Sequence, residues 1–211
     1  MKKTTLDLMF LNAVFVLGLI LSNLFGGKLI GFRDMIVPGA VITYPLTFLS
    51  TDVIGEVWGK KEADGCVKMG FIAQILFLAL GHLSLMIPAQ PQCEELQECL
   101  TVVLNQGVRM TLASMVAFVV SQPLDVYIFH RLKDKCHGKH RWLRNNGSTM
   151  ISQLFDTVIF ITIAFYGVVD EIVLMVSAQY MVKLALALLD TPFFYLFTRR
   201  KVDWNIQKRT G

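Results

Sequence analysis

Long apolar runs, separated by short clusters of charged residues, dominate the hydropathy pattern of this chain of 211 residues. A helix needs roughly 20 apolar residues to cross the hydrocarbon core of a bilayer. Six stretches are long enough, and they cover approximately residues 6–30, 35–58, 65–87, 108–129, 149–169 and 172–197. The pattern therefore predicts an all-α integral membrane protein, a bundle of about six transmembrane helices.

The connections between these runs leave little room for a separate soluble domain, so residues 1–211 are predicted to form a single transmembrane domain. The first apolar run is longer than the core of a signal peptide, which is about 7–15 residues. It also lacks a convincing small-residue cleavage site. We therefore interpret it as the first membrane helix.

The distribution of basic residues predicts the orientation of the bundle. Cytoplasmic loops of membrane proteins are enriched in Lys and Arg. With the N-terminus inside, 16 of the 20 Lys and Arg residues fall in inside segments and three fall outside. This bias predicts a protein of the cell inner membrane with both termini in the cytoplasm. It also accounts for the net charge of +4 without a nucleic-acid partner.

The cysteines and histidines give no firm indication of a metal site. Cys93 and Cys99 fall in the predicted outer loop, where a disulfide and two free thiols are both compatible with the sequence. On the cytoplasmic side, the spacing of Cys136, His137 and His140 matches no common zinc pattern. We interpret that segment as a solvated basic loop, and we predict neither a metal nor a cofactor.

Polar side chains within the apolar runs are the main candidates for a functional site. Insertion scales place Asp or Lys at a helix centre at roughly 2.5–3.5 kcal/mol each, so such residues normally face a bundle interior or a wet cavity. The predicted substrate-binding or transport residues are Asn23, Asp52, Glu56, Gln122, Asp125, Gln153, Asp156 and Lys183. Asp190 is a further carboxylate in the last run.

The spacing of these residues predicts one shared interior. Within each run they are three, four or seven positions apart, which places them on one helix face. The polar residues of the second, fourth, fifth and sixth runs also share a depth, so the site is expected between these runs, in the cytoplasmic half, whereas Asn23 lies near the outer side. Lys183 should be paired with a carboxylate of another helix, because an isolated ammonium in a membrane is costly.

A short pattern, SQxxDxxIF, occurs twice in the chain, at 121–129 and 152–160. The two predicted helices run antiparallel, so the pattern does not repeat the topology. Either two helices contribute equivalent groups to one site, or the similarity is a coincidence. Four prolines mark positions where a helix can be interrupted: Pro38, Pro45, Pro123 and Pro192. Each either breaks a helix, as happens at transporter sites, or only kinks it.

Four segments resemble the queuosine precursor transporters of the vitamin uptake transporter group. They read PLTFLSTDVIGEVWGKKEA at 45–63, SQPLDVYIFHRLK at 121–133, WLRNNGSTMISQLFDTVIFITIAF at 142–165 and KLALALLDTPFFYL at 183–196. The outer loop at 88–107 departs from this resemblance. The resemblance implies import of a 7-deazaguanine base, such as preQ0, preQ1 or queuine, for tRNA modification.

A guanine-like ring suits the polar residues of the runs. A carboxylate can accept its adjacent N–H groups, Gln or Lys can donate to its carbonyl, and an aromatic wall can stack on its face. Candidates for that wall are Tyr44, Phe48, Phe155 and Phe160.

Two other classes compete with this reading. The chain would also suit the substrate-binding membrane subunit of an energy-coupled vitamin uptake complex. An intramembrane enzyme is disfavoured, because the sequence has no GxGD-type aspartate motif, nucleophile elbow or HExxH site. The sequence leaves open which precursor is carried, how transport is energised, and whether the protein forms oligomers.

Overall fold

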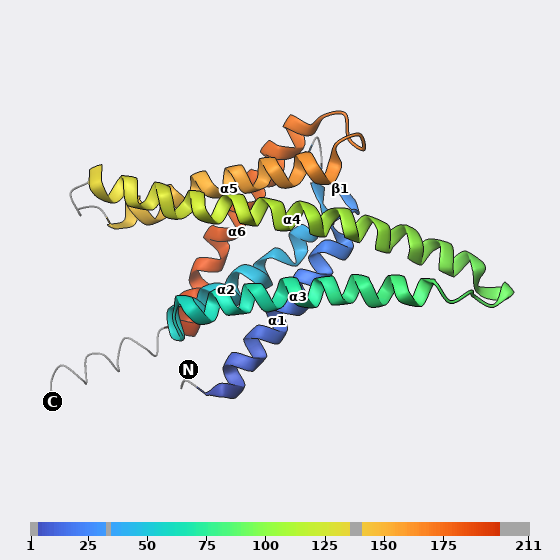
Figure 1. Cartoon of the computed structure of the whole chain (residues 1–211). Helices are drawn as coiled ribbons and strands as arrows, with labels where there is room; N and C mark the ends of the chain where they lie inside the picture. Colours follow the sequence, from blue (N-terminus) through green and yellow to red (C-terminus); the bar gives the residue numbers. More distant parts are fainter. Residues whose placement is uncertain (1–3, 33–34, 136–140, 199–211) are drawn as a thin grey trace. The chain divides into compact units, whose positions relative to one another are not determined.

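The computed structural model describes residues 4–32, 35–135 and 141–198 of the chain (Figure 1). Six α-helices make up most of this part: α1 Thr5–Phe25, α2 Tyr44–Val57, α3 Lys60–Leu85, α4 Glu94–Lys135, α5 Arg141–Phe165 and α6 Ile172–Thr198. One small two-stranded sheet, β1 Leu29–Phe32 and β2 Met35–Pro38, and two 3-10 turns, η1 Gly39–Ile42 and η2 Pro91–Cys93, complete it. The prediction of an all-α membrane protein is confirmed.

The described chain forms two compact units. The first contains α1, η1, α2, α3, α4 up to Gly107 and α6 from Ala185. The second contains α4 from Val108, α5, α6 up to Leu184, and the hairpin of β1 and β2 up to Val37. The single domain expected over residues 1–211 stays a prediction.

In the first unit, α1, α2 and α3 pack around a small apolar core. Phe15 of α1, Ile54 of α2 and Cys66 of α3 are buried together. Glycine allows the helices to approach closely, because a Cβ atom at Gly70 would lie 2.5 Å from the Phe15 ring. Small residues at contacts between membrane helices are the usual route to such packing.

The second predicted run is wrong in its N-terminal half. Instead of one helix over 35–58, the chain forms β2, then η1, and enters α2 only at Tyr44. Pro38 cannot donate a ladder or helix hydrogen bond, and Gly39 N donates to Lys28 O at 2.6 Å. A Cβ atom at Gly39 would lie 2.8 Å from Phe25 O, so the turn depends on glycine.

The first helix is also shorter than the predicted run, because α1 ends at Phe25, before two glycines. Pro45 lies in the first turn of α2, where the missing N–H has no helical partner to lose. The 14 residues of α2 span about 21 Å, which is less than the roughly 30 Å of the hydrocarbon core. The helix alone is therefore too short to cross a bilayer.

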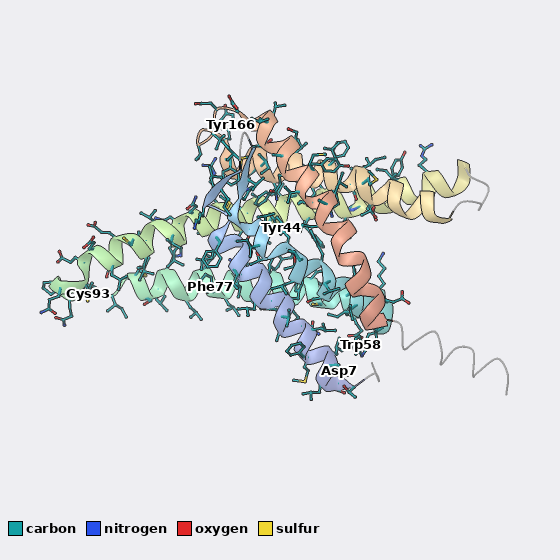
Figure 2. The ribbon with its side chains drawn as sticks, turned by 180° about the vertical axis from the view of Figure 1, so that it is seen from behind. Asp7, Tyr44, Trp58, Phe77, Cys93 and Tyr166 are labelled. Atoms are coloured by element: carbon teal, nitrogen blue, oxygen red, sulfur yellow. The ribbon has the colours of Figure 1, made fainter. Side chains whose placement is uncertain are left out.

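The predicted outer loop at 88–107 is largely helical. After α3 ends at Leu85 and η2 turns the chain, α4 begins at Glu94 and returns alongside α3 (Figure 1). His82 Nε2 lies 3.2 Å from Asn105 Oδ1 across this helical hairpin. Figure 2 shows Cys93 at its tip. Cys93 and Cys99 are exposed free thiols, whereas Cys136, His137 and His140 lie outside the described residues.

In the second unit, α4, α5 and α6 share one apolar core, and α5 lies beside α4 in both views (Figures 1 and 2). Their shared core consists of Met110, Ala113, Ala117, Phe160, Ile161, Ala164, Phe165 and Met175. The two alanines on one face of α4 permit close helix packing. Arg109 Nε donates to Ile163 O at 3.0 Å and its Nη2 donates to Tyr166 O, which fixes the C-terminal end of α5.

Three helical stretches in the described part are long and apolar enough to span a membrane: Thr5–Phe25, Lys60–Leu85 and Pro91–Asp125. Two shorter apolar stretches, Thr149–Phe165 and Ile172–Leu186, accompany them. With 42 residues, α4 is about 63 Å long, or twice the hydrocarbon thickness. One end of α4, or both, must therefore extend beyond the apolar layer. The chain is a multi-pass membrane protein, and the position of its termini stays a prediction.

Candidate functional site

A partly buried ion pair joins α5 and α6 in the second unit. Lys183 Nζ of α6 lies 2.8 Å from Asp156 Oδ2 of α5. The other carboxylate oxygen of Asp156 accepts a hydrogen bond from Ser121 Oγ of α4 at 3.3 Å. Three helices thus meet at one carboxylate. The predicted pairing of Lys183 with a carboxylate of another helix is confirmed.

A second polar contact lies next to the first. Ser152 Oγ of α5 donates to Asp125 Oδ1 of α4 at 3.1 Å. The serine of each SQxxD segment therefore donates to the aspartate of the other segment. An antiparallel helix pair has a local two-fold relation, in which position i of one helix faces position j of its partner and the reverse. The repeated pattern is thus two halves of one reciprocal contact.

Burial sets the energetic weight of this cluster. The Lys183 side chain is 8% exposed and that of Asp156 is 22% exposed. Removing two charges from water costs several kcal/mol for each ion, and their attraction offsets this cost only when further hydrogen bonds complete the geometry. Ser121 supplies one such bond. We define the polar layer as Ser121, Asp125, Ser152, Asp156 and Lys183.

The two glutamines of the repeated pattern lie beside this layer. Gln122 is exposed and Gln153 is half-buried. Thr157 is fully buried between the polar layer and the apolar core, and its hydroxyl donates to Gln153 O at 2.7 Å. The backbone of Asp190 lies in α6, but its side chain is outside the described set.

The remaining predicted site residues belong to the first unit. Asp52 and Glu56 are exposed on α2, while Asn23 is buried on α1. Near Asn23, Ser22 Oγ lies 2.5 Å from Thr43 Oγ1. A common interior shared by these residues and the polar layer stays a prediction.

The aromatic candidates are divided in the same way. Tyr44 and Phe48 stack on α2 with ring centroids 5.9 Å apart, and Figure 2 labels Tyr44 at the start of that helix. Phe160 meets Phe165 edge to face within the apolar core of the second unit. Phe155 is exposed on α5. The position of Phe160 is thus that of a packing residue.

Sequence reasoning missed several buried polar groups because it searched mainly for charges. Ser121 and Ser152 stand in the repeated pattern but were not singled out. Gln179 is fully buried on α6 and precedes Lys183 by one helical turn, so helical spacing from the lysine is the signal that would have found it. Neither atom of its carboxamide has a hydrogen-bond partner in the described structure.

Comparison with known proteins assigns the chain to a family. The family model described as "Putative vitamin uptake transporter" matches residues 38–197, a range that includes the whole polar layer. The chain belongs to the vitamin uptake transporter family. No solved structure matches the chain.

Three similar proteins have more specific names. A "Probable queuosine precursor transporter" of Bacillus subtilis (strain 168) is 36% identical over 160 residues, which is 73% of this chain and 68% of the relative. A protein of the same name from Haemophilus influenzae is 30% identical over 129 residues, covering 61% of this chain and 52% of the relative. The "Queuosine precursor transporter" of Escherichia coli (strain K12) is 25% identical over 140 residues, covering 59% and 53%. The prediction of a transporter rather than an enzyme is confirmed.

Proposed function

We propose that this vitamin uptake transporter family member imports queuosine precursors, 7-deazaguanine bases, across the cell inner membrane, with both termini in the cytoplasm. The names of its three relatives support the substrate class. The observation that carries the proposal within the chain is the polar layer, where three apolar helices meet at Asp156.

The chemistry of the polar layer suits a guanine-like base. Such a base presents an exocyclic amine, whose N–H an aspartate accepts in a charge-assisted hydrogen bond. It also presents a carbonyl oxygen, to which the Lys183 ammonium can donate. Asp125, whose Oδ1 already accepts from Ser152, offers a second carboxylate to a cationic aminomethyl group. We therefore propose Asp125, Asp156 and Lys183 as the central substrate-binding residues.

The proposal has a direct test in cells that cannot make their own precursors. Such cells, expressing the chain, are given labelled preQ0, preQ1 or queuine, and both uptake and incorporation into tRNA are measured. We expect uptake of one or more of these bases above that of cells with an empty vector. Absence of uptake for all three, with the chain present in the membrane, would contradict the proposal.

The same cells separate the two transporter readings. A carrier that acts alone supports uptake without an associated ATPase, whereas a substrate-binding subunit needs one. Affinity purification from the membrane followed by identification of bound proteins therefore distinguishes them. Dependence of uptake on a protonophore tests whether protons drive the import.

A further inference from the structure

Gln179 is a polar residue whose hydrogen-bonding groups are completely unused. Its side chain is 0% exposed, and both Nε2 and Oε1 lack a hydrogen-bond partner in the described part of the chain. A buried amide without partners costs free energy that an apolar side chain of the same size would not cost. Stability of the closed bundle therefore does not explain this residue.

The position of Gln179 ties it to the polar layer. On α6 it stands one turn before Lys183 and one turn after Met175, on the same buried face. Lys183 contacts Asp156, while Met175 packs in the apolar core with Phe160 and Ile161. Gln179 thus stands between these two levels, with its α-carbon about 6 Å along the helix axis from that of Lys183.

We propose that the Gln179 carboxamide recognises the lactam edge of the substrate, the adjacent ring N–H and C=O of a guanine-like base. This inference rests on the proposed function. A carboxamide presents one acceptor and two donors, so it can form a pair of hydrogen bonds with a group that presents one donor and one acceptor. Neither neighbouring ionic group can do this, because an ionised aspartate only accepts and an ammonium only donates.

The assignment divides recognition between two levels of the bundle. Asp156 and Lys183 supply charge, whereas Gln179 supplies one donated and one accepted hydrogen bond. A site built to hydrogen-bond a polar edge rejects an analogue that lacks the edge, because its own polar groups are then left without partners. The carboxamide therefore discriminates between a ring with this N–H and C=O edge and a ring that lacks it.

The test compares two ligands on the purified full-length chain in lipid nanodiscs. The ligands are a 7-deazaguanine that the wild type imports and its 6-deoxo analogue, in which hydrogen replaces the oxo group and the neighbouring ring nitrogen carries no hydrogen. We expect the wild type to bind the oxo ligand roughly ten- to a hundredfold more tightly. Equal binding of the two by the wild type would overturn the inference.

Variants extend the test to the residue itself. Gln179→Met keeps the length of the side chain and removes its polar groups. We expect this variant to bind the oxo ligand roughly ten- to a hundredfold more weakly and to lose the difference in affinity between the two ligands. We also expect its thermal unfolding midpoint to be higher than that of the wild type. Gln74→Met is the matched control, since Gln74 of α3 is also buried with Oε1 unpartnered. This variant should bind as the wild type does.

The outcomes separate the two proposals. If the wild type neither imports nor binds any 7-deazaguanine, the proposed function fails. If it binds them and Gln179→Met retains both the affinity and the discrimination, only the role of Gln179 fails. If the Gln179→Met variant is less stable than the wild type, Gln179 stabilises the fold and the inference is wrong.

Discussion

Lys183 and Asp156 lie 27 positions apart in the sequence, yet Nζ of the lysine is 2.8 Å from Oδ2 of the aspartate. This contact joins α6 to α5 at the level where Ser121 of α4 also reaches the carboxylate. The pair therefore has two separable consequences. It contributes to the packing of three helices, and it places a charged group at the proposed substrate site.

A double-mutant cycle separates these two contributions. Asp156→Asn and Lys183→Met each remove one partner of a buried pair, which costs about 3–5 kcal/mol, so both single variants should accumulate poorly in the membrane. The double variant removes both charges and should recover most of the lost folded protein. Its uptake of precursor should nevertheless stay at background. Quantitative membrane immunoblots and uptake assays measure the two effects, and uptake by the double variant would show that the pair is structural.

Asp125 should be needed for uptake but not for folding. Asp125→Asn retains the shape and the oxygen that accepts from Ser152, so the variant should reach the membrane at near-normal levels. Its charge-assisted bond to the substrate is lost, and uptake should fall by tenfold or more, as expected for a loss of about 1.5–3 kcal/mol. Glu94→Gln, at an exposed position of α4, is the control. Normal uptake by Asp125→Asn would remove this residue from the site.

The reciprocal serine contacts should stabilise the second unit. Ser121→Ala and Ser152→Ala each remove one donor to an aspartate of the facing helix, at a cost of about 0.5–1.5 kcal/mol. Thermal melting of the purified chain measures this cost. Ser177→Ala is a matched control, because that hydroxyl is exposed and bonds back to Leu174 O within its own helix. If all three variants melt alike, the serines do not carry the contact between α4 and α5.

Cysteine labelling tests the orientation. Cys93 and Cys99 are exposed near the tip of the α3–α4 hairpin, whereas Cys66 is 1% exposed in the core of the first unit. In intact spheroplasts, after treatment with a reductant, a membrane-impermeant maleimide should label Cys93 and Cys99 and leave Cys66 unlabelled. Labelling of single-cysteine versions assigns each signal. If Cys93 reacts only after the membrane is permeabilised, the predicted topology is inverted.

Hydropathy predicted those parts of the fold that depend on lipid exposure. The apolar runs correspond to α1, α3, α4, α5 and α6, because long lipid-compatible segments must form helices. It failed at residues 35–43, where apolarity conceals Pro38 and a turn that depends on Gly39. Hydropathy also predicted a loop at the start of α4. Residues 94–106 nevertheless contain no proline or glycine, and residue types with high helix propensity predominate there.

The candidate site was predictable in its chemistry but not in its pairing. Helical spacing and the cost of charge in lipid were enough to place Lys183 opposite a carboxylate of another helix. The exchange of partners between Ser121 and Asp156, and between Ser152 and Asp125, depends on the register of two antiparallel helices. Helical spacing within each segment does not reveal that register. Gln179 was missed because a neutral amide hardly changes a hydropathy profile.

The polar layer also has a consequence for the electrical work of transport. Its five residues include two carboxylates and one ammonium, so the ionised layer carries one excess negative charge. A cationic aminomethyl base entering beside Asp125 neutralises this excess, whereas a neutral base leaves it to be balanced by a proton or by another ion. Moving one elementary charge across the membrane is worth about 2.3 kcal/mol for each 100 mV of potential. The charge of the precursor therefore determines whether the membrane voltage assists its import directly.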